Sequence, residues 1–183
     1  MRLTVILLLV MAGCTQPSKI NELALSNLKG ESTQIDLAQN TITVIYFLSP
    51  ECPLCINYTL AFKAISKQFV NDSVRFYGIH SGKWFSAKEV NGYKLKYDLD
   101  FDMLLDHGNL LAQALGASVT PEVFVLNSNS DILYSGKIDN WVNDLGKKKL
   151  KVSEHYLSEA LASLIKGEAI ETKKTEPVGC LIE

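Results

Sequence analysis

The segment from Thr41 to Leu48, TITVIYFL, is the sequence feature that most constrains the fold. It is a continuous run of β-branched, aromatic and aliphatic residues, which is typical of a strand buried on both faces of a sheet. Two cysteines, Cys52 and Cys55, follow at once, and apolar residues then recur near helical spacing over residues 56–70. The sequence therefore predicts a buried strand that turns, through a Cys-x-x-Cys motif, into a helix.

The rest of the chain alternates predicted strands and helices. Residues 74–79 alternate apolar side chains as a strand does, and Ser86 with Glu89 forms the capping-box pattern that begins a helix. We also expect a short strand at 101–105, a helix at 109–115 ended by Gly116, a hairpin of strands at 122–126 and 131–138, and a last helix from Ser153 to about Lys166. This order predicts an α/β sandwich, with a central mixed β-sheet flanked by helices.

The first 14 residues, MRLTVILLLVMAGC, have the layout of a secretory signal. Arg2 is followed by an apolar run that is far shorter than the ~20 residues a membrane-spanning helix needs. Met-Ala-Gly-Cys is similar to the bacterial lipobox, although Met11 stands where Leu is usual. This resemblance implies that Cys14 is lipidated and anchors the mature protein in the bacterial cell envelope, facing the periplasm or in the outer membrane.

We therefore expect a signal peptide at 1–13, a tether at 14–33 with a short helix around residues 20–28, one domain at 34–168 and a C-terminal tail at 169–183. The 18 basic and 20 acidic residues give a net charge of −2. Such a balance leaves no large field of one sign for nucleic acid, so we expect no nucleic-acid partner. We expect a monomer whose contact with the membrane is its N-terminal lipid.

The Cys-x-x-Cys pair suits reversible dithiol chemistry. A thiolate at a helix N-terminus is stabilised by the helix dipole and free backbone N–H groups, which lowers its pKa. Cys52, at the helix start, is expected to attack, and Cys55, one turn inside, to release the partner by attacking the mixed disulfide. A zinc site would bring a second Cys pair or a His pair at ligand spacing, and the sequence has neither. A permanent structural disulfide is the alternative.

A second motif, Ser-Val-Thr-Pro-Glu at 118–122, precedes the predicted hairpin. The order strand, CxxC, helix and much later Thr-Pro, strand, turn, strand, helix resembles the thioredoxin superfamily over residues 34–166. The phrase LLDHGNLLAQALGASVTPEVFVL is similar to its redoxin branch, which contains TlpA-like reductases and peroxiredoxins (the AhpC/TSA group). The resemblance implies that Pro121 is a cis-proline and that Thr120 pairs with the partner's chain as a strand would. The alternative is an ordinary proline that opens an edge strand.

The resemblance implies an extracytoplasmic thiol–disulfide oxidoreductase that exchanges electrons with dithiol or disulfide proteins and needs no organic cofactor and no metal. Thiol peroxidase activity is one alternative, but a peroxiredoxin loop reads Pro-x-x-x-Thr/Ser-x-x-Cys. Ser49 and Cys52 fit that pattern, whereas Ile45 takes the place of the proline. A Cu(I)-binding chaperone that uses the two cysteines with His107 or Cys180 is a second alternative. His80 and His107 are otherwise expected to be polar loop residues.

Cys180 leaves the mature chain with an odd number of thiols once Cys14 is acylated. It lies in the apolar stretch Val-Gly-Cys-Leu-Ile at 178–182, beyond the last predicted helix. Three interpretations stay open: a bystander thiol, a possible third redox cysteine that exchanges with the CxxC pair, or a thiolate ligand for a soft metal such as Cu(I). The tail is long enough to reach the CxxC pair across a small domain.

Overall fold

The computed structural model describes residues 20–39, 41–69, 73–144 and 146–183. The predicted signal peptide and the predicted lipidation site, Cys14, lie outside the described residues. None of the helices in the described ranges is long and apolar enough to cross a membrane.

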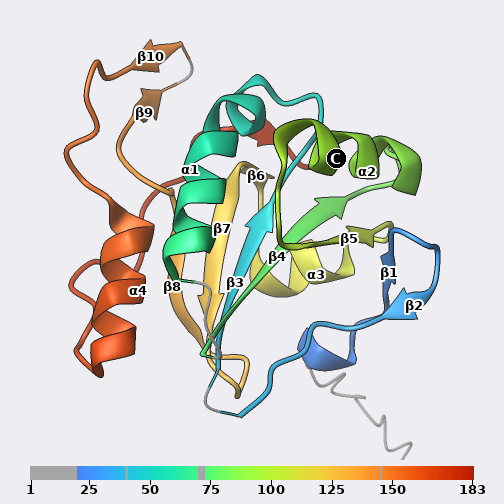
Figure 1. The fold of residues 1–183 in the computed structure, drawn as a ribbon, viewed down its shortest axis with the longest axis horizontal. Coiled ribbons are helices and arrows are strands. Elements are labelled where there is room, and N and C mark those ends of the chain that lie inside the picture. Colours follow the sequence, from blue (N-terminus) through green and yellow to red (C-terminus); the bar gives the residue numbers. More distant parts are fainter. Residues whose placement is uncertain (1–19, 40, 70–72, 145) are drawn as a thin grey trace, which may run out of the picture.

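A mixed sheet is the centre of the structure (Figure 1), and seven strands of the described chain form it in the order β2-β1-β5-β4-β3-β7-β8. Strands β3, β4 and β5 are parallel neighbours, while β7 and β8 run antiparallel at one side. The bounds are β1 Leu25–Asn27, β2 Ser32–Thr33, β3 Ile42–Phe47, β4 Val74–Ser81, β5 Asp102–Asp106, β7 Glu122–Leu126 and β8 Ile132–Gly136. The mixed sheet and the β7–β8 hairpin confirm the predicted α/β sandwich.

Helices cover both faces of this sheet (Figure 1). Buried residues of α1 (Pro53–Phe69), α2 (Ala87–Tyr97) and α4 (Tyr156–Lys166) belong to one apolar cluster. Those of α3 (Leu110–Leu115) belong to the cluster on the opposite face, together with the 3-10 turn Ile20–Glu22. The predicted capping box is present, because Ser86 and Glu89 bond each other's backbone N–H at the start of α2.

Strand β3 is buried on both faces, as its composition predicts. Tyr46 packs against Phe62 of α1 on one side, with ring centroids 4.8 Å apart, and Phe47 packs against Phe124 on the other, at 5.7 Å. Burying an aromatic or aliphatic side chain of this size contributes about 1.5–3 kcal/mol to stability. The strand is therefore a rigid support for the loop that follows it.

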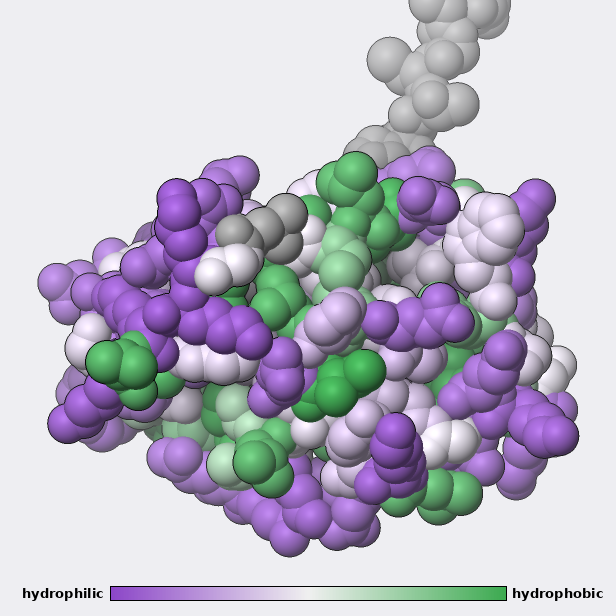
Figure 2. Space-filling model, turned by 90° about the horizontal axis from the view of Figure 1, so that it is seen from above, coloured by the Kyte–Doolittle hydropathy of each residue, from purple (hydrophilic) through white to green (hydrophobic). Residues whose placement is uncertain are grey.

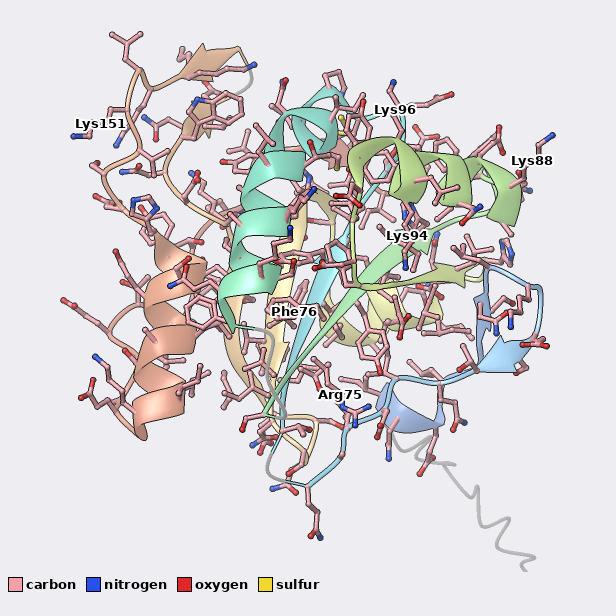
Figure 3. All side chains as sticks on the ribbon, viewed as in Figure 1. Arg75, Phe76, Lys88, Lys94, Lys96 and Lys151 are labelled. Carbon is pink, nitrogen blue, oxygen red and sulfur yellow. The ribbon has the colours of Figure 1, made fainter. Side chains whose placement is uncertain are left out.

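On β4 and α2, side chains point either to the core or to the surface (Figure 3). On β4, Phe76 points into the layer beneath α1, while Arg75 points to the surface and pairs with Asp36 at 2.6 Å. On α2, Lys88 points to solvent, and Lys94 turns beneath the helix, where its Nζ donates to the Phe101 carbonyl at 2.7 Å. Period-two and period-3.6 patterns thus separate core from surface as expected.

Two predicted elements differ in the structure. The expected helix around residues 20–28 is only the turn Ile20–Glu22, after which β1 and β2 join the sheet, so the described part of the predicted tether packs on the domain. The last helix begins at Tyr156 rather than after Ser153. Ser153 does not cap it because its hydroxyl accepts from Asn140 Nδ2 and its N–H donates to Asn140 Oδ1.

The C-terminal tail does not leave the domain as a free segment. Its first part runs beside β8, where Ser135 N donates to Lys173 O and Thr175 N donates to Ser135 O, both at 3.0 Å. Its end forms the short strand β11 (Cys180–Leu181), which pairs with β6 (Val119–Thr120). A second small hairpin, of β9 (Val142–Asp144) and β10 (Lys147–Lys148), lies beyond β8 in sequence.

Candidate active site

Cys52 and Cys55 lie where β3 passes into α1. A turn, closed by a bond from Cys52 N to Ser49 O at 3.2 Å, places Cys52 directly before the helix. Pro53 is the first helical residue, where its missing N–H costs little, and Cys55 lies in the first turn. The predicted strand, motif and helix are therefore present, with one cysteine at the helix N-terminus and one inside it.

The loop before β7 lies against Cys52. The Thr120–Pro121 peptide bond is cis, as the family resemblance implied, and Cys52 Sγ lies 3.1 Å from the Thr120 carbonyl oxygen. Glu122 holds this loop, because its buried Oε2 accepts from Ser118 N at 2.9 Å. Thr120 and Pro121 are thus brought to the Cys-x-x-Cys motif by β7, the strand that pairs with β3.

Cys52 is the more acidic thiol of the pair. A hydrogen bond from the Cys55 thiol is the main cause that lowers the pKa of Cys52 to about 4, and bonds from Cys180 and from the Cys55 backbone N–H act in the same direction against the opposing effect of burial. The Thr120 hydroxyl makes the smallest contribution to lowering the pKa of Cys52. This hydroxyl is buried and has no hydrogen bond of ordinary geometry in the described chain. The lowered pKa favours the thiolate form of Cys52 at neutral pH.

Cys55 has the opposite character. Its side chain is fully buried, and burial, followed by the hydrogen bond to Cys52 and the negative charge on Cys52, holds its pKa well above the ordinary range. Ser49 N donates to its Sγ at 3.4 Å, and the Tyr93 hydroxyl donates to its carbonyl at 3.2 Å. The pair thus holds one reactive thiolate and one protonated thiol, an arrangement that suits attack by the first and later attack by the second.

The third cysteine of the described chain completes the site. Cys180 Sγ donates to Cys52 Sγ over 2.6 Å, and all three thiols are free. Burial, the hydrogen bond to Cys52 and the charge on Cys52 raise the pKa of Cys180 to about 12. The structure therefore brings Cys180 to the Cys-x-x-Cys motif, as a third redox cysteine requires and as a bystander thiol does not.

A pocket of about 420 Å³ opens beside these thiols. Cys180 and Thr120 form part of its wall, together with Glu51, Trp84 and Leu181. Trp84 is 64% exposed, and apolar side chains reach the surface among polar ones on this end of the molecule (Figure 2). The pocket is therefore a place where a further chain could contact both Cys180 and apolar surface.

His80 is buried, contrary to expectation, whereas His107 is exposed in a turn as predicted. His80 is not a polar loop residue, because it lies on β4 with 1% of its surface exposed, and this burial lowers its pKa to about 3. His107 is exposed after β5. Within the described ranges, no group of three or more His, Cys, Asp or Glu side chains has the arrangement of a metal site.

Sequence reasoning missed three residues that shape the site. Glu122 fixes the loop before it, Tyr93 bonds the Cys55 carbonyl, and Gly179 lies against the backbone of Thr120. A carboxylate directly after Thr-Pro was the one available signal, since an acidic residue that opens a buried strand needs partners. The sequence carries no comparable signal for Tyr93 or Gly179.

Comparison with known proteins gives a family and a fold. The family described as AhpC/TSA matches residues 18–135, while no curated protein matches the sequence. An uncharacterized conserved protein from Geobacillus kaustophilus is similar in structure, with a TM-score of 0.77, 22% identity and coverage of 87% of each chain.

Two structures from Mycobacterium tuberculosis are also similar. One is a secreted disulfide oxidoreductase homologous to E. coli DsbE, with a TM-score of 0.59 and 18% identity over 80% of this chain and 98% of that one. The other is dsbF in mixed oxidized and reduced forms, with a TM-score of 0.61 and 15% identity over 82% and 99%. At these identities the likeness shows the fold, which is thioredoxin-like.

Proposed function

The chain belongs to the AhpC/TSA family, and on that premise we propose that it is a thiol–disulfide oxidoreductase in which Cys52 is the nucleophile and Cys55 the resolving thiol. The observation that carries this proposal is the contrast between the two thiols. Cys52 lies at the helix N-terminus with its pKa lowered to about 4, whereas the pKa of buried Cys55 is raised. A permanent structural disulfide would need no such difference.

The exchange proceeds in two balanced steps. The Cys52 thiolate attacks one sulfur of a partner's disulfide, which forms a mixed disulfide and releases the partner's other sulfur as a thiolate. Cys55 then loses its proton and attacks Cys52 Sγ, so that the second partner sulfur leaves and the Cys52–Cys55 disulfide forms. The partner gains two electrons and the pair loses two. The reverse sequence oxidises a dithiol partner, and no organic cofactor takes part.

Thr120 and Pro121 are proposed to bind the partner's chain. The Thr120 carbonyl lies 3.1 Å from Cys52 Sγ, at the edge strand β6. A partner segment that pairs with this edge as an added strand would place its cysteine at Cys52 through backbone hydrogen bonds. Physiological partners are therefore expected to be proteins with an exposed, extended cysteine segment.

A redox titration of the full chain tests this function. The Cys180→Ser variant isolates the Cys52–Cys55 pair, whose oxidised fraction is followed by alkylation and mass spectrometry in glutathione or dithiothreitol buffers. We expect one reversible two-electron transition at a potential above the ~−270 mV of thioredoxin, because a stabilised thiolate favours the reduced form. Two thiols that form no reversible disulfide across this range would contradict the proposal.

Peroxide reduction is the second candidate, because the family that matches the chain is compatible with it. A low thiol pKa suits that reaction too. The position at which a peroxiredoxin loop carries proline is Ile45, however, and Ile45 is buried within β3, away from the loop that carries Cys52. Oxidation of reduced protein by hydrogen peroxide, compared with oxidation by a protein disulfide, separates the two: we expect the disulfide to react faster.

We also propose that the protein acts outside the cytoplasm and is anchored by a lipid on Cys14. The basis is the lipobox-like sequence before Cys14, which lies outside the described residues. In the bacterial host, Cys14→Ala is expected to leave the membrane fraction and to lose fatty-acid labelling. A variant that stays membrane-bound and labelled would overturn the anchoring proposal without touching the redox chemistry.

A further inference from the structure

The end of the chain lies on the edge where a partner strand would bind. β11 pairs antiparallel with β6, so that Cys180 lies opposite Thr120 and Leu181 opposite Val119. Ile182 N extends the ladder by donating to Ser118 O at 3.0 Å. The tail thus uses the backbone groups of residues 118–120 in the way proposed above for a partner, and it brings a cysteine to Cys52 in doing so.

Gly179 allows this close approach. A Cβ atom at Gly179 would lie 2.2 Å from the Thr120 carbonyl oxygen and 2.7 Å from its carbon, and both are backbone atoms that a side-chain rotation cannot move. A residue with a side chain therefore cannot take this position unless the strand moves away. The glycine before Cys180 is a steric requirement of the docked strand.

The tail is attached to the domain in two places, first along β8 and then in the groove beside β6. Residues 173–175 bond β8, and Lys137 N donates to Thr175 Oγ1 at 2.8 Å. Beyond them the tail makes the short ladder with β6, the bond from Cys180 Sγ to Cys52 Sγ and a bond from Asn109 Nδ2 to Glu183 O at 3.1 Å. Val178 and Ile182 pack against the apolar clusters, whereas Leu181 is 76% exposed. We expect residues 176–183 to leave the groove as a unit while the preceding segment stays attached.

With the tail docked, Cys52 is 2% exposed and does not line the pocket, whereas Cys180 does. A partner's sulfur then has no path to Cys52. The tail also lies beyond residues 18–135, which the family matches. The docked tail closes the position where chemistry would occur.

We propose that residues 176–183 are an internal partner strand: they occupy the partner groove and present Cys180 to Cys52 as a substrate protein presents its cysteine. The inference rests on the proposed function for the identity of the groove. Its partners would be extended protein segments with a cysteine preceded by glycine, since any side chain there would meet Thr120. Because the tail is tethered, its effective concentration is on the order of millimolar, so a partner must compete with it.

The same placement gives Cys180 a redox role. In the Cys52–Cys55 disulfide, the Cys180 thiolate can attack Cys52 Sγ, which forms the Cys52–Cys180 bond, breaks the Cys52–Cys55 bond and releases Cys55 as a thiolate that takes up the proton from Cys180. No net electrons are exchanged, and attack by Cys55 reverses the step. Once Cys52 is in a disulfide, it no longer carries the negative charge that helps to raise the pKa of Cys180. The Cys52–Cys180 disulfide therefore holds the tail in the groove, and attack by Cys55 on Cys52 frees it.

Alkylation of fully reduced protein tests whether the tail covers Cys52. We compare wild type, Gly179→Ala and the matched control Gly92→Ala, a helical glycine with nothing within 4 Å of an added Cβ, after checking that all three have the same circular dichroism. The rate at Cys52 is read by peptide mass spectrometry at neutral pH. We expect Gly179→Ala to raise it at least about tenfold, as release of a local protecting segment does, and Gly92→Ala to leave it unchanged. Equal rates in wild type and Gly179→Ala would overturn the proposal.

A peptide added in trans gives a second test, because a Gly179→Ala chain that is folded with its groove open should regain protection of Cys52 when the peptide binds. The peptide EPVGCLIE is the sequence of residues 176–183, and we add it with its cysteine replaced by serine to the full-length Gly179→Ala and Cys180→Ser chains. The peptide is expected to slow alkylation of Cys52 in the Gly179→Ala chain, whose groove is open. It is not expected to do so in the Cys180→Ser chain, whose own tail stays docked. A peptide with alanine in place of its glycine should have no effect, and equal protection by both peptides would overturn the inference.

These measurements use reduced protein and no turnover. If the redox titration shows no reversible disulfide while the tail still protects Cys52 from alkylation, the oxidoreductase proposal is wrong and the placement of the tail in the groove is supported. If the titration shows a reversible Cys52–Cys55 disulfide while Cys52 is alkylated at the same rate in every variant, the oxidoreductase proposal is supported and the internal-strand proposal is wrong.

Discussion

The Sγ atom of Cys180 lies 2.6 Å from that of Cys52, although the two residues are 128 positions apart in the chain. The β11–β6 ladder holds this approach, and Cys52 Sγ lies 3.1 Å from the Thr120 carbonyl oxygen. The three sulfurs therefore share one environment, in which Cys52 carries the charge and the other two thiols donate to it. The pKa of Cys52 depends on both other thiols, and the pKa of each of those depends on Cys52.

The first prediction concerns the pH dependence of Cys52. Because its pKa is lowered to about 4, its alkylation rate should be flat over about pH 6–8 and fall only below about pH 5, whereas an ordinary thiol gains reactivity up to about pH 8.5. Peptide-resolved alkylation across this range measures the midpoint. A midpoint near 8–9 would show that the thiolate is not stabilised.

The causes of that shift can be ranked by substitution. The bond from Cys55 is the largest and that from Cys180 is smaller. Cys55→Ala should therefore raise the pKa of Cys52 more than Cys180→Ala does. The reverse order would mean that the tail, rather than the motif, stabilises the thiolate.

A second prediction concerns Glu122, which holds the Thr-Pro loop. Burial raises its pKa above the ordinary 4.5, so between the two values the unfolded state has released its proton while the folded state retains it. Stability from this group is present below about pH 4.5 and is lost as pH rises through the folded value. Glu122→Gln, which keeps an acceptor for Ser118 N but does not titrate, should therefore gain on wild type in free energy of unfolding between about pH 4 and pH 7.

Urea unfolding at the two pH values checks this. Glu168→Gln, at an exposed position, is the control for the loss of one negative charge, and it should show a smaller pH dependence of the difference. Glu122→Gln could instead lose stability relative to wild type as pH rises. That result would show that hydrogen bonds from the loop N–H groups lower the pKa of Glu122 by more than burial raises it.

The third prediction concerns two core tyrosines. The hydroxyl of Tyr46 is buried with no hydrogen-bond partner in the described chain, whereas the hydroxyl of Tyr58 donates to Asp139 Oδ1 at 2.7 Å. An unsatisfied buried hydroxyl costs about 1–3 kcal/mol, and removing one partner of a buried bond costs a similar amount. Tyr46→Phe should therefore be neutral or stabilising, and Tyr58→Phe destabilising by about 1–3 kcal/mol.

Chemical denaturation of the two variants measures both changes against the same wild type. Equal destabilisation by both would show that Tyr46 has a hydrogen-bond partner in solution.

The elements that carry the site could be predicted because their signals are local. The run from Thr41 to Leu48 is buried on both faces, the cysteines follow it, and the apolar spacing of α1 is visible in sequence. The start of the last helix was predicted too early because Ser153 has two possible uses, and contact with Asn140 takes precedence over capping. A cap residue alone does not show which partner it has.

The docking of the tail could not be predicted for a different reason. It depends on backbone hydrogen bonds to β6 and on the missing Cβ of Gly179, and neither has a periodic signature. Sequence reasoning showed that Cys180 could reach the motif, but three interpretations stayed open because reach does not determine contact. Glu122 was missed likewise, since its partners are N–H groups of its own loop.

Trapping of mixed disulfides tests the central claim, that Cys52 is the attacking thiol, most directly. Two double variants of the full chain, Cys55→Ser with Cys180→Ser and Cys52→Ser with Cys180→Ser, remove internal resolution by the tail and differ only in which motif cysteine remains. Each is expressed in the bacterial host, blocked with an alkylating agent and analysed on non-reducing gels, with the linked peptide identified by mass spectrometry. We expect partner disulfides on Cys52 in the first variant and none on Cys55 in the second. Equal trapping by both, or trapping on Cys55 alone, would show that Cys52 is not the attacking thiol.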